Sequence, residues 1–231
     1  MHQSLEGDLK KMSNPLLIKK IFPTIQGEGP YAGRPAVFVR LGSCNLECPL
    51  CDTEFREGAV LMEEEAILSA IGSKDGISLA VITGGEPFQH KIGPLTRELI
   101  KRGFQVQIET NGTLYQEDFP YGDPGAVVVC SPKMPKVHPR LAPYVAAYKY
   151  VVRAGYLSSD GLPSESFGGV KAPPARPAES FFNSFRHRIY LSPCDEKNPA
   201  ANAKNLEAAV DSCLAHDYLL SVQIHKIIGM E

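Results

Sequence analysis

The feature of this sequence that most constrains its fold is a regular alternation of short apolar runs with helical patterns. The apolar runs are rich in β-branched or aromatic residues and end in turn residues, which is typical of strands. Strands that alternate with helices form parallel β-α units, so the sequence predicts an α/β fold. The predicted strands are Ala36–Leu41, Leu79–Thr83, Phe104–Glu109, Ala126–Cys130, Tyr148–Arg153, Arg188–Leu191 and Leu219–Ile224, with an outer strand at Leu16–Phe22.

Three segments between these strands carry helical periodicity, at Met62–Ile71, Ile92–Arg102 and Ala200–Asp217. The first contains three glutamates in its opening turn, where negative charge suits the helix dipole. The third carries an apolar stripe at helical spacing, which we expect to face the core. The stripe consists of Leu206, Ala209, Val210, Cys213 and Leu214.

Nearly every chemically distinctive segment of the chain begins where a predicted strand stops. A cysteine-rich loop follows the run AVFVRL, and the segments GGEP, TNG, SPK, SPCD and HK each follow a later strand. Barrels and open α/β sheets bind their ligands at the carboxyl ends of the strands. The sequence therefore predicts six loops that converge on one mouth.

The length and charge of the chain limit its partners. Its 231 residues carry a formal net charge of −2, which argues against a protein whose main work is to hold phosphate backbones. No apolar run approaches the roughly 20 residues that cross a bilayer, and the first fifteen residues lack a signal-peptide core. We therefore expect a soluble, cytoplasmic protein with no membrane partner and no direct nucleic-acid partner.

The composition also suggests how the chain is divided. We expect a polar N-terminal extension over residues 1–15 and a single domain over residues 16–231. Within that domain, a stretch rich in Gly, Pro and Ser near residues 154–180 is too long for an ordinary connection, so we interpret it as an insertion.

Three of the six cysteines, Cys44, Cys48 and Cys51, fall within eight residues. In a reducing cytosol such thiols stay free or bind metal, and this spacing suits zinc or an iron–sulfur cluster. Three cysteines would leave one iron of a four-iron cluster open to the amine and carboxylate of a small molecule. Zinc would need a fourth ligand, for which His90 and His138 are candidates. Spacing favours the cluster but leaves zinc and incidental cysteines open.

Arg40 is the second-to-last residue of an otherwise apolar strand, and period-two alternation places it on the same face as Phe38. A half-buried guanidinium needs an anionic partner, and its planar fork suits a carboxylate. From the residues alone, a ligand carboxylate and an internal salt bridge are equally good partners. The glycine-rich stretches Gln26–Pro30 and Gly84–Pro87 indicate, taken alone, only tight turns.

Taken together, the three-cysteine loop and Gly84–Pro87 resemble the radical S-adenosylmethionine (radical SAM) superfamily. Within it, the run from Phe22 to Thr53 is similar to the 7-carboxy-7-deazaguanine synthase family, as are Glu109–Thr113, Ser131–Lys133 and His225–Gly229. The resemblance spans essentially the whole chain beyond the first fifteen residues. It implies a modified, incomplete (β/α) barrel.

The resemblance also implies an activity. Members of that family are lyases that convert 6-carboxy-5,6,7,8-tetrahydropterin to 7-carboxy-7-deazaguanine with loss of ammonia, on the pathway to queuosine. They use a [4Fe–4S] cluster, SAM and Mg²⁺. Cleavage of SAM by the reduced cluster yields a radical that takes hydrogen from C6 of the pterin, and SAM is regenerated. The expected partners are a reductant such as flavodoxin or ferredoxin and a second copy of the chain in a homodimer.

Residue roles follow from the same resemblance. The cluster ligands would be Cys44, Cys48 and Cys51, and the Mg²⁺ ligand would be Thr53. The SAM contacts would be Leu50, Cys51, Asp52, Gly85, Ser131, Pro132, Lys133, Ser192, Pro193, Cys194 and Asp195. The pterin contacts would be Ile25, Gln26, Gly27, Arg40, Thr83 and Glu231.

The chain departs from the family pattern in three places. Ser192–Asp195 stands where a QPxD-like loop is expected, and the chain ends in Met230–Glu231 where a proline is frequent. The insertion near 154–180 has no family role. Two rival interpretations remain: a radical SAM activase that acts on a partner protein, and a zinc-binding or redox protein without catalysis.

Overall fold

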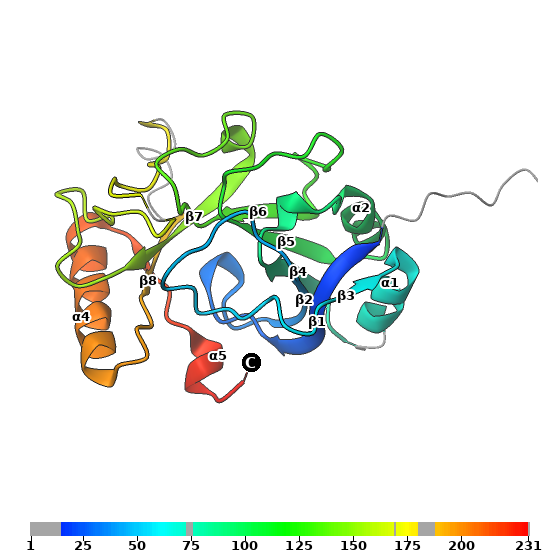
Figure 1. Ribbon diagram of the computed structural model, residues 1–231, viewed down its shortest axis with the longest axis horizontal. Helices are drawn as coiled ribbons and strands as arrows, with labels where there is room; N and C mark the ends of the chain where they lie inside the picture. Colours follow the sequence, from blue (N-terminus) through cyan, green and yellow to red (C-terminus); the bar gives the residue numbers. More distant parts are fainter. Residues whose placement is uncertain (1–14, 73–75, 169, 180–187, 231) are drawn as a thin grey trace, which may run out of the picture.

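The computed structural model describes residues 15–72, 76–168, 170–179 and 188–230. In this part of the chain one nine-stranded sheet has the order β3-β1-β2-β4-β5-β6-β7-β8-β9 (Figure 1). The strands are β1 (Leu16–Ile25), β2 (Pro35–Leu41), β3 (Val60–Met62), β4 (Leu79–Gly84), β5 (Gln105–Thr110), β6 (Ala126–Cys130), β7 (Val145–Val152), β8 (Ile189–Pro193) and β9 (Leu219–Leu220).

Every neighbouring pair from β2 to β9 is parallel, whereas β1 runs antiparallel to both β2 and β3. The strand order leaves β3 at one edge and β9 at the other, so the sheet is open. The predicted α/β fold is therefore confirmed, and the open parallel sheet agrees with an incomplete barrel. The helices are α1 (Glu64–Gly72), α2 (Gly93–Lys101), α4 (Pro199–His216) and α5 (Ile224–Ile227), with 3₁₀ turns η1 (Gly29–Tyr31), η2 (Pro87–Gln89) and η3 (Ala142–Tyr144).

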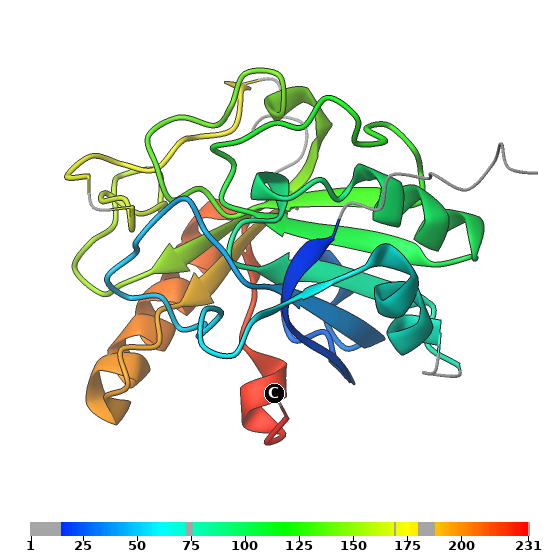
Figure 2. The same cartoon turned by 45° about the vertical axis from the view of Figure 1, so that its right-hand side comes forward.

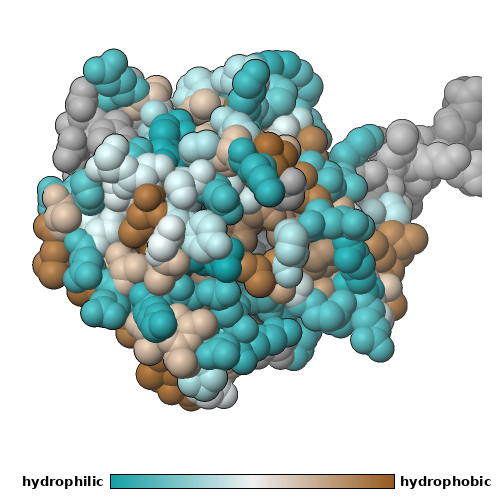
Figure 3. Space-filling model, turned by 60° about the vertical axis from the view of Figure 1, so that its left-hand side comes forward, coloured by the Kyte–Doolittle hydropathy of each residue, from teal (hydrophilic) through white to brown (hydrophobic). Residues whose placement is uncertain are grey.

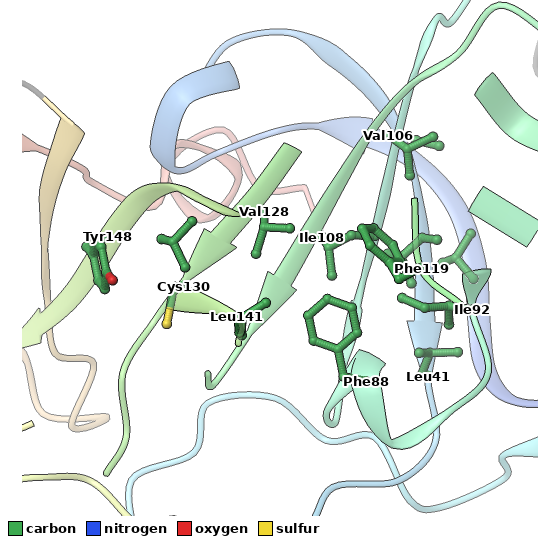
Figure 4. Close-up of a cluster of buried hydrophobic side chains, with 14 of the residues drawn as sticks. Leu41, Phe88, Ile92, Val106, Ile108, Phe119, Val128, Cys130, Leu141 and Tyr148 are labelled. Atoms are coloured by element: carbon green, nitrogen blue, oxygen red, sulfur yellow. The ribbon is translucent and has the colours of Figure 1, made fainter. Parts of the chain in front are cut away.

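Alternation along the strands gives the sheet two different faces. On β5, Val106 and Ile108 belong to the main apolar core, whereas Gln107 and Glu109 point to the opposite face. Figure 4 shows part of this core, where Phe88 and Ile108 lie among other buried apolar side chains. The apolar face packs against the helices, which leaves the other face free to carry polar chemistry.

Two strand predictions need correction. The expected outer strand at Leu16–Phe22 is β1, but β3 lies beyond it at the edge. Val60 and Leu61 of β3 are exposed, and so short a strand at an edge leaves no alternating pattern to detect. The expected strand Leu219–Ile224 ends at Leu220, because the chain then turns into α5.

The predicted buried stripe of α4 is only partly confirmed, since Ala209 is buried and Cys213 packs against the main core, but both leucines are exposed. Leu214 is 81% exposed and Leu206 is 40% exposed, whereas Asn205 and Ser212 are buried beside Ala209. The buried face of α4 is thus partly polar.

Two hydrogen-bonded anchors explain this orientation of α4. Asn205 donates to the backbone oxygen of Cys194 at 3.0 Å and accepts from the amide of Ala154 at 2.8 Å. Ser212 donates to the backbone oxygen of Gly161 at 2.6 Å. Satisfied polar anchors to the loops after β7 and β8 therefore set the face that α4 buries.

The expected domain division stays a prediction. Residues 1–14 of the expected extension and residues 169 and 180 of the expected insertion lie outside the described residues. The described part of the insertion packs on α4, since Leu162 is fully buried and Tyr218 donates to the backbone oxygen of Asp160 at 2.8 Å. None of the described helices is long and apolar enough to cross a membrane.

Candidate functional site

A cavity of about 770 Å³ lies at the carboxyl ends of the parallel strands. It is lined by residues from the loops after β2, β4, β5, β6 and β8, together with side chains of β7. The segment after β9 contributes only Gln223, not the HK pair. The predicted convergence of strand-end loops on one mouth is confirmed for every loop except the HK pair after β9. Its volume lies within the usual range of small-molecule binding pockets.

One wall of the cavity is the cysteine loop, which runs without helix or strand from residue 42 to residue 59. Cys44, Cys48 and Cys51 all line the cavity. Burial raises the pKa of the Cys48 thiol, and the nearby ammonium of Lys133 opposes this shift. The thiols are also close enough to influence one another electrostatically.

Three sulfur donors on one loop that lines a cavity fit a [4Fe–4S] cluster with one iron open to a ligand. Among the described residues, no three His, Cys, Asp or Glu side chains already converge as a metal site. No histidine of the described ranges lines the cavity. His90 contacts the Ser43 hydroxyl at 2.8 Å, and His138 stacks on Tyr115, so neither candidate supplies the fourth ligand of a zinc site.

Gly84 and Gly85 join the cysteine loop to the end of β4. Gly84 has a φ of 111°, and a side chain at Gly85 would clash with the backbone of Ser43. The amide of Glu86 donates to the Ser43 oxygen at 2.7 Å. Both glycines also line the cavity, so their small size serves the loop contact and leaves backbone exposed to a ligand.

The carboxylate of Glu86 points away from the cavity, into the protein. It is fully buried and accepts from the Phe88 amide at 3.0 Å, the Thr110 hydroxyl at 2.6 Å and the Asn111 amide at 2.7 Å. Burial raises the pKa of Glu86 to about 7, against the effect of these three donors. Glu86 therefore fixes the loop after β5 relative to the loop after β4.

The residues expected to contact SAM come together around the cysteine wall. All of them line the cavity except Pro132, which is buried. Lys133 donates to the Ser131 hydroxyl at 2.8 Å, and burial lowers the pKa of its ammonium. Cys194 is buried at the cavity edge, where burial raises its pKa to about 11.

Another part of the cavity lining carries a cluster of largely buried charges, which we call the charged wall and define as Glu28, Glu109 and Lys149. The Lys149 ammonium lies 2.7 Å from Glu28 and 3.5 Å from Glu109. The side chain of Lys149 is only 9% exposed. Burial works to lower its pKa, but the two carboxylates outweigh this, so the pKa of Lys149 is raised. All three residues line the cavity.

Other side chains fix Glu109 in the charged wall. Gln26 donates to it at 3.1 Å, Gln107 at 2.9 Å and the Thr83 hydroxyl at 3.3 Å. Of these, only Thr83 lines the cavity. The carboxylate is therefore held in one orientation by strand-borne donors before any ligand arrives.

Four of the residues expected to contact the pterin do not line the cavity: Ile25, Gln26, Gly27 and Arg40. Gln26 is buried behind Glu109, and Arg40 lies over the ring of Phe22, 5.1 Å from its centroid. The Arg40 side chain packs next to Gly84, which does line the cavity. Glu231 lies outside the described residues.

Thr53, the expected Mg²⁺ ligand, lines the cavity on the far side of the cysteine loop. Its hydroxyl lies 3.4 Å from Asp52 Oδ1, so two oxygen donors are adjacent there.

Reasoning from the sequence missed the charged wall and Phe167. Lys149 stands in the apolar run YKYVV, the same signal that made Arg40 conspicuous, and Glu109 continues the polar alternation of Gln105 and Gln107. Phe167 comes from the insertion and lines the cavity 5.8 Å from the Lys133 ammonium. Nothing in its local sequence distinguishes it.

Comparisons with known proteins agree with this geometry. The sequence model of the Radical SAM superfamily matches residues 39–120. The chain is 42% identical to 7-carboxy-7-deazaguanine synthase of Rhodospirillum rubrum, over 92% of both chains. It is 35% identical to the enzyme of that name from Rickettsia prowazekii, over 98% of this chain and 92% of the other. The crystal structure of QueE from Escherichia coli superposes with a TM-score of 0.66 at 26% identity, over 92% of this chain and 95% of that one.

Proposed function

The chain belongs to the 7-carboxy-7-deazaguanine synthase family of radical SAM enzymes, and we propose that the two walls of its cavity divide the ligands of that reaction between them. The reaction converts 6-carboxy-5,6,7,8-tetrahydropterin to 7-carboxy-7-deazaguanine with loss of ammonia. The cysteine wall holds the cofactors and the charged wall holds the pterin. The observation that carries this proposal is the presence of both walls on one cavity.

On the cysteine wall, Cys44, Cys48 and Cys51 hold the [4Fe–4S] cluster that the superfamily implies. When bound, the cluster supplies an electron for radical formation from SAM. Cys51 is exposed at the cavity, which gives a reductant such as flavodoxin or ferredoxin a short path to that electron.

The residues around the cysteines orient SAM. The backbone of Gly85 is open to the SAM amine, and Lys133 and Ser131 offer donors on the adjacent loop. The hydroxyl of Ser192 is buried at the cavity and has no hydrogen-bond partner among the described residues. An orphaned buried hydroxyl on a cavity wall supports a ligand contact there.

On the charged wall, Glu109 and Glu28 accept from the amino and ring N–H groups of the pterin. Lys149 pairs with both carboxylates and holds their oxygens in place, so they are fixed acceptors for these groups. Gln26 and the neighbouring Ile25 and Gly27 act behind this wall, since Gln26 orients Glu109. Arg40, beside Gly84, meets the substrate carboxylate, and Thr83 contacts the ring.

Mg²⁺ binds at Thr53 and Asp52 in this proposal. Oxygen donors suit this hard cation, and two protein oxygens leave the remaining positions of the octahedron to water and substrate.

A homodimer is part of the proposal, with α4 and β9 as the contact face. Leu214 of α4 and both residues of the edge strand β9 are exposed there. On the face shown in Figure 3, which turns the left-hand side of Figure 1 forward, apolar residues otherwise form small separate groups. Light scattering is expected to give twice the chain mass, and a monomer at all concentrations would refute the dimer.

An anaerobic reaction analysed by mass spectrometry tests the function. It contains reconstituted protein, reductant, SAM, Mg²⁺ and 6-carboxytetrahydropterin, with no protein partner. We expect a product one ammonia lighter than the pterin, without proportional consumption of SAM. Cleavage of SAM with an intact pterin would reject the substrate, and zinc without sulfide in the purified protein would reject the radical chemistry.

A further inference from the structure

The segment that follows β9 contacts both sides of the cavity mouth. It contains Gln223 and the short helix α5, which stands apart at the lower edge of the molecule in Figure 2. The Lys226 ammonium lies 3.3 Å from Asp52 Oδ2 and 2.8 Å from Asp195 Oδ2. Asp52 belongs to the cysteine loop after β2, and Asp195 belongs to the loop after β8. One ammonium thus joins loops that are far apart in the sequence.

The two carboxylates are held differently. Asp195 is fixed independently of Lys226, because its Oδ1 accepts from the Lys197 amide at 3.0 Å and from the Asn202 side chain at 2.9 Å. Asp52 has no such support from its own loop beyond the adjacent Thr53 hydroxyl at 3.4 Å. Its Oδ2 instead accepts from the side chains of Gln223 at 2.8 Å and Lys226. The segment after β9 therefore supplies the donors that Asp52 lacks in its own loop and joins Asp52 to Asp195.

The same segment also contacts the chain beside the charged wall. The Ile224 amide donates to the Gly27 oxygen at 3.3 Å. The His225 ring occupies the space beside Gly27 that any side chain at that position would need. Gly27 lies between Gln26, which orients Glu109, and Glu28 of the charged wall itself. A single turn of helix thus contacts the supports of both proposed ligand sites.

We propose that Lys226 is a positioning residue that assembles the SAM site and couples SAM binding to pterin binding. This inference rests on the proposed division of the cavity. Lys226 holds Asp52 against Asp195, so the two loops that flank SAM form one surface. Pterin on the charged wall steadies Gly27 and with it α5, which stabilises the Lys226 bridge and raises the affinity for SAM. By linkage, SAM raises the affinity for pterin by the same factor.

The geometry supports a shared bridge rather than an ordinary surface ion pair. An exposed pair contributes little, because it orders two long side chains for a screened attraction. Here the two carboxylates are ordered by other donors, and a single side chain serves both.

The test uses anaerobic, reconstituted holoenzyme and calorimetric titration of SAM, with and without 6-carboxytetrahydropterin. Lys226→Met is expected to raise the SAM Kd about tenfold and to reduce the effect of pterin on that Kd to nearly none. Lys226→Arg, which keeps a charge that spans both carboxylates, should recover most of the affinity. Lys204→Met, on the exposed face of α4, is the matched control and should leave both quantities unchanged.

Asp195→Asn gives a second approach that does not alter α5. The amide keeps an oxygen for Lys197 and Asn202 but loses the oxygen that faces Lys226. Because Asp195 is itself an expected SAM contact, the comparison is a double-mutant cycle with Lys226→Met. The loss of SAM affinity in the double variant should be clearly smaller than the sum of the two single losses, because both changes break one bridge. Additive losses would overturn the bridge.

Iron and sulfide content separate this proposal from simple damage to the cluster, and should equal those of the wild type in each variant. Loss of the coupling between SAM and pterin binding should also appear as more 5′-deoxyadenosine released per molecule of product. An unchanged SAM Kd in Lys226→Met with intact cluster content would overturn the proposal. If wild-type protein binds SAM but does not convert pterin, the proposed substrate fails, whereas the SAM titrations still decide the role of Lys226.

Discussion

The two walls of the cavity are built by different means. The charged wall consists of residues on strands β5 and β7 and of the half-buried Glu28, and its members hold one another by ion pairs and a hydrogen bond. The cysteine wall is a loop with few internal bonds, such as the Cys51 amide to the Cys48 oxygen at 3.1 Å. Hydrogen bonds from residues outside the loop hold it in place, including those from Asn111 to Asn45 and from Lys226 to Asp52.

This difference indicates which part of the site the fold determines. Strand-borne, buried charges are ordered when the sheet forms, so the charged wall is complete without ligand. The cysteine loop depends on contacts from other loops for its position. Under the proposed division of the cavity, substrate recognition is a property of the fold, whereas cofactor binding is a property of loop assembly.

Loss of one cysteine should give the largest functional effect and leave the charged wall intact. We expect Cys48→Ala to lose the cluster and all turnover, since the remaining two thiols cannot replace the third ligand. Iron and sulfide analysis with the turnover assay measures this. Cys213→Ala, on α4 and away from the cavity, is the matched control and should keep both. If Cys48→Ala retained the cluster, the cysteine wall would not be the cluster site, and the distinction between a cofactor wall and a charged wall would be lost.

The largest stability effect should come from the charged wall. Lys149→Met leaves Glu28 and Glu109 facing each other in a buried site, which should lower the free energy of unfolding by about 3–5 kcal/mol. Denaturant unfolding at pH 7 measures it, with Lys204→Met expected to change little. A loss below about 1 kcal/mol would mean that the wall is solvated and not set by folding.

Glu86, which links the two loops between the walls, should make stability depend on pH. Its folded pKa of about 7 lies above the ordinary value of 4.5, so its contribution is greatest below pH 4.5 and is lost as pH rises to 7. The free energy of unfolding should fall by about 3 kcal/mol over that range relative to Glu86→Gln. Equal pH slopes for the two proteins would show that Glu86 ionises normally in the fold.

Arg40→Ala should separate the ligands. We expect pterin affinity to fall about 10- to 100-fold, because a substrate carboxylate loses a charged hydrogen-bond partner. SAM affinity should change less than about threefold, since Arg40 is not on the cysteine wall. Equal losses for both ligands would show that Arg40 acts on the sheet as a whole.

Local patterns in the sequence were enough to predict the strands of the sheet and the cysteine wall. The buried strands are short apolar runs. Cys44, Cys48 and Cys51 lie so close together in the sequence that their spacing can be recognised without a structure. The order of the strand-end loops around the mouth follows directly from parallel pairing.

The charged wall could not be predicted in the same way. Glu28 and Lys149 are 121 residues apart, and only the sheet brings them together. Lys149 gave a local signal as a lysine in an apolar strand, but its partners did not. The buried face of α4 was only partly predicted for a related reason, because Asn205 and Ser212 are buried through hydrogen bonds to distant loops, and apolar spacing ignores such bonds.

The most direct test of the two-wall account is pterin binding to protein that has no cluster. Calorimetric titration of 6-carboxytetrahydropterin into Cys48→Ala, without SAM, is expected to give a Kd within about threefold of that of the reconstituted wild type. Adding Glu109→Gln should weaken pterin binding by a similar factor in Cys48→Ala and in the reconstituted wild type. Pterin binding that disappears with the cluster would contradict the claim that folding alone completes the charged wall.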